Sequence, residues 1–280
     1  MKLCSYSING NAGYGIVTDA GIIALGDRYP DSPTLRQFLH NHGVGEAGKA
    51  AGQAPDLQLG DVTLKPVITD PDKIVCVGLN YHAHIEETGR TVSEQPVLFP
   101  RYAGSQVGHG EPMIKPRESD KFDYEGELAV IIGTGGRRIS ETDALRHVAG
   151  YACFNDGSIR DWQRHTHQFM PGKCFANSGS FGPWMVTADE IPDPATLTLT
   201  TRLNGEVMQH ATCDLLIHTI PVLINYISTI LPLLPGDVIV SGTPGGVGAR
   251  RDPPVWMRDG DTIEVEIDSV GKLVNPIVAE

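Results

Sequence analysis

The chain has 280 residues, of which 40% are hydrophobic and 20% charged, and its formal net charge is −12. This composition is typical of a globular protein with one large domain, or a large domain plus a small one. The negative charge argues against nucleic-acid backbones and anionic membranes as partners. It does not exclude a small anionic substrate, because a bound cation can reverse the local field.

The cysteines and the first residues set two further expectations. The five cysteines are scattered and form no Cys-x-x-Cys pair, which argues against a disulfide framework or a thiolate zinc site. The first residues lack the apolar stretch of a signal peptide. We therefore expect a cytoplasmic location.

Residues 1–70 have the pattern of a small separate α/β unit. A helix is expected from Ser32-Pro33, which resembles a helix start, to Gly43, and residues 44–60 have the composition of a loop or linker. Short strands are expected at residues 3–7, 14–17 and 22–25. We expect a boundary near residue 70, with an accessory domain before it and a catalytic domain at 71–280.

Residues 71–280 predict a β-rich α+β domain, because the strands do not alternate regularly with helices. We expect helices at 141–148 and 219–231, with Thr219 as cap and Pro221 in the first turn, and a helical turn near His84. The stretch 215–234 carries no formal charge, but its apolar residues have the spacing of a core-facing helix, with Ser228 off the stripe. Strands are expected at 74–78, 96–99, 125–132, 151–155, 184–187, 197–203, 237–241, 262–267 and 272–278.

The most informative motif is Glu125-Gly-Glu127, which leads into an apolar run without alternation, typical of a strand buried on both faces. Side chains alternate along a strand, so Asp123, Glu125 and Glu127 share one face, with neighbouring carboxylates about 6–7 Å apart. Buried like charges are unfavourable unless a cation or shared protons offset them. A second Glu-x-Glu, at residues 264–266, alternates strictly with apolar residues and predicts a solvated acidic face.

Asp156 ends a predicted strand and would complete a three-carboxylate oxygen site with Glu125 and Glu127. Alone, it has an equally good interpretation as a capping residue. Carboxylate oxygens suit Mg²⁺, Mn²⁺ or Ca²⁺ better than zinc. We expect Mg²⁺, with Mn²⁺ and Ca²⁺ as alternatives.

The segment Asn80-Tyr-His-Ala-His-Ile-Glu-Glu87 offers a general base. His84 and Glu87 lie three residues apart, on one face of a helical turn, and a carboxylate beside an imidazole orients it and raises its basicity. His82 and His84 could instead form a His-x-His metal pair. Taken alone, the segment also has the composition of an exposed polar loop.

Other polar residues could contact a ligand. Arg160 and Gln163 follow Asp156 at spacings of four and seven, so a helix would place all three on one face. Lys173, on a Gly-flanked loop, could stabilise an oxyanion, and Thr243 could offer a hydroxyl from a glycine-rich loop. The alternative is that these residues are solvated positions of a helix or loop and bind no ligand. Arg101 is a weaker candidate for the same ligand.

Taken together and in this order, these segments resemble the fumarylacetoacetate hydrolase superfamily over about residues 70–280. The matching pieces are Gly78-Leu-Asn-Tyr-His-Ala-His84, Asp123-Tyr-Glu-Gly-Glu-Leu-Ala-Val130, Asn155-Asp-Gly-Ser-Ile-Arg-Asp-Trp-Gln163, Gly172-Lys173, Gly182-Pro-Trp184, Asn204-Gly205 and Pro235-Gly-Asp-Val-Ile-Val-Ser-Gly-Thr-Pro-Gly-Gly-Val-Gly248. The sequence departs from the family in a histidine-rich lid and in Pro100-Arg101, where Leu-Lys is commoner.

The resemblance implies a mixed β-roll catalytic domain, usually a homodimer, with a small accessory domain before it. It implies a divalent cation held by Glu125, Glu127 and Asp156, and a His-x-x-Glu dyad at His84 and Glu87. It also implies Lys173 as the oxyanion lysine, and substrate contacts from Arg160, Gln163 and Thr243.

The function expected first is hydrolysis of a C–C bond in a β-diketo acid such as an acylpyruvate. The His84–Glu87 pair would activate water, Lys173 would stabilise the oxyanion, and the metal would hold the departing enolate. Decarboxylase, isomerase or lyase chemistry on an oxaloacetate-like acid needs almost the same site. An alternative of another class is a catalytically silent protein that binds an oxo acid or metal.

Overall fold

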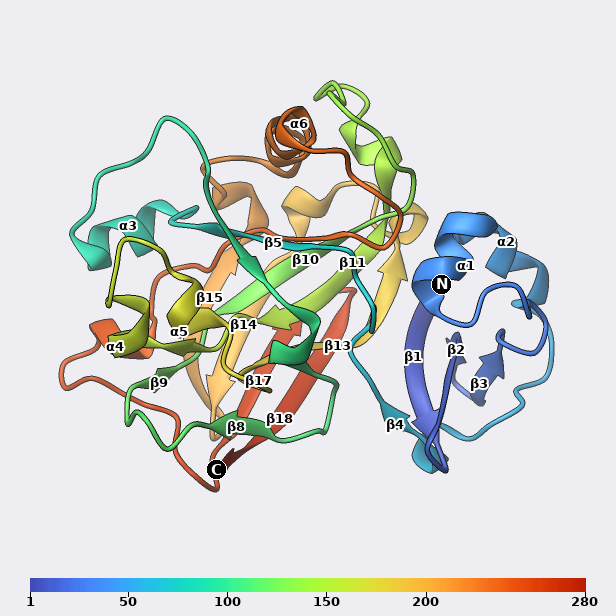
Figure 1. The fold of residues 1–280 in the computed structure, drawn as a ribbon, viewed down its shortest axis with the longest axis horizontal. Helices are drawn as coiled ribbons and strands as arrows, with labels where there is room; N and C mark the ends of the chain where they lie inside the picture. Colours follow the sequence, from blue (N-terminus) through green and yellow to red (C-terminus); the bar gives the residue numbers. More distant parts are fainter.

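The computed structural model describes residues 1–280, and its framework is a mixed sheet of 11 strands (Figure 1). The main path runs β3-β2-β1-β13-β11-β10-β16-β5-β6, with β4 beside β1 and β7 beside β13. Within this sheet, the parallel neighbours are β5 with β16 and β7 with β13, and the other pairs are antiparallel. The strands are β1 (Lys2–Ile8), β2 (Asn11–Thr18), β3 (Gly21–Ala24), β4 (Thr63–Leu64), β5 (Ile74–Gly78), β6 (Val97–Arg101), β7 (Gln106–Val107), β10 (Gly126–Ile132), β11 (Val148–Asn155), β13 (Gly179–Thr187) and β16 (Val238–Val240).

A second sheet of five strands, in the order β15-β14-β17-β18-β8, packs against the first, and two short strands form a separate pair. Its central strands β14 and β17 alternate between half-buried and buried side chains, so one face points into the core. The bounds are β8 (Met113–Lys115), β14 (Thr198–Leu203), β15 (Glu206–Thr212), β17 (Thr262–Ile267) and β18 (Gly271–Ala279), with the pair β9 (Phe122–Asp123) and β12 (Ser158–Ile159).

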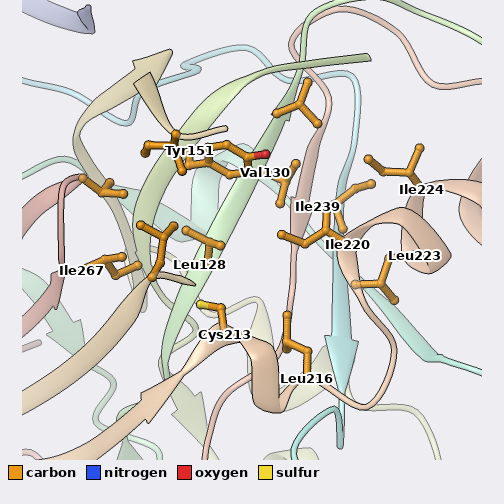
Figure 2. Packing of buried hydrophobic residues seen from close by; sticks show 14 of the residues in the cluster. Leu128, Val130, Tyr151, Cys213, Leu216, Ile220, Leu223, Ile224, Ile239 and Ile267 are labelled. Atoms are coloured by element: carbon orange, nitrogen blue, oxygen red, sulfur yellow. The ribbon is translucent and has the colours of Figure 1, made fainter. Parts of the chain in front are cut away.

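The largest core cluster lies between the two sheets and the helix α6 (Ile220–Ile230). Figure 2 shows Leu128 and Val130 of β10 among these residues, with Ile239, Ile267 and the apolar stripe of α6 around them. Every residue of β10 is buried, because this strand has a sheet neighbour on each side and packed layers on both faces. The predicted doubly buried strand after Glu125 is therefore confirmed.

Helices are few and short, and none has both the length and the apolar character needed to cross a bilayer. The α-helices besides α6 are α1 (Leu35–Asn41), α2 (Val44–Ala47), α3 (His82–Thr88), α4 (Arg160–Gln163) and α5 (Met170–Lys173). The 3₁₀ turns are η1 (Gly48–Ala50), η2 (Leu59–Asp61), η3 (Ala103–Ser105), η4 (Ala144–His147), η5 (Ala188–Glu190), η6 (Pro194–Thr196), η7 (Cys213–Leu215) and η8 (Gly248–Arg250). The chain is thus a sheet-dominated α+β protein, as predicted.

Three local predictions were wrong. The helix expected at 141–148 is only the 3₁₀ turn η4, because Val148 already begins β11. The loop expected at 44–60 contains α2, η1 and η2. Ser228, expected off the apolar stripe of α6, is fully buried, and its hydroxyl accepts a hydrogen bond from the amide of Ile139. Thr219 takes the N-cap position of α6, but its side chain makes no capping hydrogen bond.

Residues 1–70 join the rest of the chain through both sheet and core. Strand β1 pairs with β13, with Leu3 opposite Met185. A second core cluster contains Leu3 and Phe38 together with Phe154 and Met185. The N-terminal residues, at the right of Figure 1, thus extend the large sheet and share a core with it.

We predict that Leu3→Ala lowers the free energy of unfolding of the whole chain by about 2–5 kcal/mol, the usual range for a large-to-small core substitution. Leu3 is fully buried at the junction between β1 and β13. Denaturant unfolding monitored by fluorescence should keep one transition. The control Val207→Ala truncates a side chain that is 51% exposed and should change stability by less than about 0.5 kcal/mol. A second, separate transition in Leu3→Ala would contradict the shared core.

Candidate active site

Three carboxylates meet at one end of two neighbouring strands. Glu125 immediately precedes β10, Glu127 lies in β10, and Asp156 immediately follows β11. The strands are antiparallel, with Gly126 opposite Asn155, so the start of one meets the end of the other. One oxygen from each carboxylate lies within 4.8 Å of the others, and all three residues are buried. The structure thus brings together the residues predicted for the metal site.

The backbone between the glutamates is held from several sides. The carbonyl of Glu125 accepts a hydrogen bond from the amide of Asp156 at 2.8 Å. The carbonyl of Gly126 accepts from the hydroxyl of Thr243 at 2.9 Å. A Cβ at Gly126 would lie 2.0 Å from Oγ1 of Thr201 in β14. Only glycine therefore fits between the two glutamates while the second sheet packs this closely.

Buried cations neutralise two of the three carboxylates. Lys173 Nζ lies 2.6 Å from both Glu125 Oε2 and Asp156 Oδ2, and Arg101 Nη1 lies 2.5 Å from Asp156 Oδ1. Arg160 Nη1 lies 2.6 Å from Glu125 Oε1. Burial alone would raise the pKa of Glu125, but the charges of Arg160 and Lys173 outweigh it and hold this pKa well below its ordinary value.

Glu127 has no cationic partner. Its Oε2 accepts a hydrogen bond from the amide of Gly242 at 2.6 Å, and its side chain forms no ion pair. Burial, together with repulsion from Asp156 and Glu125, raises its pKa well above the ordinary value. Without an added cation, Glu127 therefore favours its neutral, protonated form, because no ion pair of the protein stabilises its carboxylate.

A hard divalent cation fits this donor set. The three side chains offer closely spaced carboxylate oxygens and no sulfur or imidazole ligand, which is the chemistry that Mg²⁺, Mn²⁺ and Ca²⁺ prefer. A cation held by Glu125, Glu127 and Asp156 would also favour the carboxylate form of Glu127, which has no cationic partner.

Asp123, which shares the predicted acidic face, is not part of the carboxylate cluster. It is fully buried and lies 2.7 Å from Arg160 Nε. Its two oxygens also accept hydrogen bonds from the amides of Gly248 and Ala249, at 2.8 and 3.0 Å. Asp123 thus orients Arg160 and fixes the glycine-rich loop beside the site.

The His84–Glu87 pair is formed as predicted on one face of α3. Nδ1 of His84 lies 2.6 Å from Oε1 of Glu87, and the other Glu87 oxygen accepts from the amide of Gly246 at 2.8 Å. His84 is buried and lines the same cavity as Glu125 and Glu127. Nε2 is therefore the ring nitrogen left for a ligand. His82 is exposed and does not line the cavity, so the alternative His82–His84 metal pair is not formed.

The predicted substrate contacts also converge, although not through one helix. Only residues 160–163 are helical, and Asp156 is separated from them by β12, so the expected continuous helical face was wrong. Arg160, Gln163 and Thr243 nevertheless line one cavity of about 60 Å³. Nη2 of Arg160 is buried without a hydrogen-bond partner. This N–H group is a donor ready for a ligand oxygen, because an unpaired buried donor is otherwise unfavourable.

Lys173 is more constrained than predicted. In this arrangement its ammonium group contacts Glu125, the side chain of Asp156 and, at 3.4 Å, the carbonyl of Asp156. An ammonium has three N–H donors. Lys173 can therefore stabilise an oxyanion only by exchanging one of these contacts.

Sequence reasoning missed four arginine roles. Arg101 does not line the cavity; it is fully buried and holds Asp156, with further hydrogen bonds to the carbonyl of Gly157 and the hydroxyl of Ser178. The other three, Arg90, Arg164 and Arg250, line the cavity with Arg160. Their sequence context is polar and loop-like, so only the tertiary fold reveals them.

Comparison with known proteins agrees with the fold. The family model described as "Fumarylacetoacetate (FAA) hydrolase C-terminal" matches residues 73–278. Over 267 residues, the chain is 40% identical to proteins of Bos taurus and Homo sapiens named mitochondrial oxaloacetate tautomerase, covering 92% of this chain and 84% of each relative.

Solved structures give the same picture. A fumarylacetoacetate hydrolase from Exiguobacterium antarcticum superimposes with a TM-score of 0.84 at 34% identity and covers 100% of both chains. A maleylpyruvate hydrolase from Sphingobium sp. SYK-6, solved with manganese(II) and pyruvate, gives 0.83 at 29% identity, covering 100% of this chain and 99% of the other. The resemblance seen in the sequence is confirmed: the chain belongs to the fumarylacetoacetate hydrolase family.

Proposed function

We propose that this protein is an enzyme that moves a proton between carbon and oxygen of a small 2-oxo acid, interconverting the keto and enol forms of an oxaloacetate-like substrate. The observation that carries the proposal is the meeting of three features in one cavity: the carboxylate cluster, the unpaired Nη2 of Arg160 and the His84–Glu87 pair. The 40% identity to relatives named oxaloacetate tautomerase supports the choice of reaction.

Each residue has a defined task in this proposal. Arg160 Nη2 binds the carboxylate beside the 2-oxo group, and Gln163, whose Oε1 accepts from Arg160 Nη1, keeps its amide N–H donors for the ligand. Thr243 lines the same wall, with its hydroxyl proton already given to Gly126. A cation held by Glu125, Glu127 and Asp156 would supply positive charge that favours the enolate form of the 2-oxo group.

Proton transfer falls to His84. Glu87 accepts the Nδ1–H, which fixes the tautomer with a basic Nε2 toward the cavity. Nε2 takes a proton from the carbon next to the 2-oxo group and gives it to the 2-oxo oxygen. The keto form thus becomes the enol form, and neither the enzyme nor the substrate gains or loses a proton overall. The reverse transfer uses the same atoms.

C–C bond hydrolysis of an acylpyruvate is the second candidate, favoured by the same dyad. Nε2 of His84 could take the proton of a water instead of a carbon-bound proton. The 29% identity to a maleylpyruvate hydrolase supports this choice. It asks more of the site, because Lys173 must leave a carboxylate to stabilise the oxyanion. Decarboxylation and lyase reactions share the same enolate.

We also propose that the active form is a homodimer in the cytoplasm, with residues 1–70 as an accessory domain to a catalytic domain of residues 71–280.

The tautomerase proposal predicts that the wild-type protein accelerates enol–keto exchange of oxaloacetate with Mg²⁺ or Mn²⁺, measured by enol absorbance. His84→Gln should lower kcat/KM by about 100-fold or more, because it removes the base. His82→Gln is the matched control, since it changes an exposed histidine on the same helix, and should change the rate less than twofold. Full activity in His84→Gln would contradict the assignment of the base.

A panel of acylpyruvates tests the second candidate. If His84 activates water, His84→Gln lowers hydrolysis more than oxaloacetate decarboxylation, because only hydrolysis needs a nucleophilic water. Equal losses in both reactions would argue against water activation. Absence of turnover on every substrate, with tight binding of oxalate in the presence of Mn²⁺, would favour the catalytically silent binder.

The metal assignment predicts that Glu127→Gln weakens Mn²⁺ binding by at least about 100-fold, beyond the range for residues that merely orient a ligand. Isothermal titration calorimetry of the chelator-treated protein measures the affinity. Glu264→Gln is the matched control, because it lies in the second Glu-x-Glu and pairs with Lys272 on the surface. Equal Mn²⁺ affinity in wild type and Glu127→Gln would remove Glu127 from the site.

A further inference from the structure

Three arginines from separate segments gather at the rim of the active-site cavity. Arg90 follows the end of α3, Arg164 follows α4, and Arg250 ends η8. All three are exposed at their outer ends and line the same cavity as Glu125 and Lys173. Figure 1 shows α3 and α4 on the same side of the molecule. We call Arg90, Arg164 and Arg250 the rim arginines.

None of the rim arginines forms an ion pair with a carboxylate. Arg90 lies over the ring of Phe169 at 5.4 Å, and Arg250 Nη2 donates to the carbonyl of Thr88 at 3.3 Å. The side chain of Arg164 makes no hydrogen bond within the protein. This differs from the deeper Arg101 and Arg160, each of which is paired with a buried carboxylate.

The rim arginines also repel one another. Partial burial, together with repulsion from Arg250, Arg160 and Arg90, lowers the pKa of Arg164. A single unpaired surface arginine needs no explanation, and Arg137 is one elsewhere on the surface. Three unpaired arginines around one cavity do need an explanation. Bringing like charges together raises the electrostatic energy unless an anion binds between them. The chain carries 12 more acidic than basic groups, yet no carboxylate forms an ion pair with any of the rim arginines.

We propose that the rim arginines bind the second carboxylate of a dianionic oxo acid and thereby select dicarboxylates over monocarboxylates. The proposal rests on the proposed function: with the first carboxylate and the 2-oxo group at Arg160 and the carboxylate cluster, the far end of the substrate extends toward the rim. Guanidinium groups suit a carboxylate because their N–H donors can bind both of its oxygens. The rim arginines are thus specificity-determining residues, and the deeper residues perform the chemistry.

The test compares oxaloacetate with its 4-methyl ester, which keeps the carbon skeleton and the 2-oxo acid but lacks the second charge. We expect Arg164→Gln to lower the ratio of kcat/KM for oxaloacetate to that for the ester by about three- to tenfold, which lies between the effects typical of an exposed ion pair and of a buried charged hydrogen bond. The triple variant Arg90→Gln, Arg164→Gln, Arg250→Gln should lower it further. Arg164→Glu should reverse the preference.

The matched control is Arg137→Gln, which removes the same charge from an exposed arginine outside the cavity and should leave the ratio unchanged. Added salt should lower the wild-type ratio, because exposed charges are screened. Melting temperatures of all variants check that they are folded.

The outcomes separate the two proposals. Turnover of both substrates by the wild type, with the same ratio in wild type and in the triple variant, would overturn the role of the rim arginines and leave the proposed function intact. Turnover of neither substrate by the wild type would overturn the proposed function. A fall of the ratio in Arg137→Gln equal to that in Arg164→Gln would assign the effect to net charge and overturn the site.

Discussion

The site depends on one unbalanced set of buried charges. Four carboxylates, those of Asp123, Glu125, Glu127 and Asp156, are enclosed with the three cations Arg101, Arg160 and Lys173. Paired strands hold these groups together in the interior, and the repulsion at Glu127 raises the pKa of its carboxyl group. A protein interior tolerates such an arrangement when the missing positive charge can be supplied from outside. The proposed metal follows from this imbalance, and the proposed anionic substrate follows from that metal together with the unpaired N–H group of Arg160.

The surrounding structure serves to keep the charges fixed. The carboxylates sit at strand ends, where the sheet determines their spacing, and Arg101 and Asp123 each secure a neighbour rather than face the cavity. The glycine-rich loop is fastened to both Asp123 and Glu87. It therefore links the carboxylate cluster to the His84–Glu87 pair, which comes from a different segment of the chain.

Local patterns in the sequence predicted much of this arrangement. The unbroken apolar run after Glu127 and the alternation around Glu264 correctly separated a buried acidic pair from a half-buried one. The strands 74–78 and 262–267 were predicted with the bounds that the structure has. The three-residue spacing of His84 and Glu87 predicted their contact, because such a spacing is local to one helical turn.

Several of the failures have one physical reason, which is that they concern contacts between segments far apart in the chain. Arg101 meets Asp156 across 55 residues, and nothing near either residue indicates the pair. The same holds for the rim arginines, whose segments are polar and irregular. The expected helix at 141–148 failed because β11 begins at Val148, where it pairs with β10, and this pairing overrides local propensity.

The arrangement of the site also bears on how one family can include proteins named for several different reactions. In the proposed mechanism, Arg160 and a cation held by the carboxylate cluster would favour an enolate whatever follows, so these groups would not choose among tautomerisation, hydrolysis and decarboxylation. In this mechanism the choice would lie with the group next to His84 Nε2, either a carbon-bound proton or a water, and would depend on how the substrate fills the cavity. A ligand anchored at both ends, by Arg160 and by the rim arginines, leaves least room for a water beside His84. Dianion recognition and tautomerase chemistry are therefore consistent with each other in this protein.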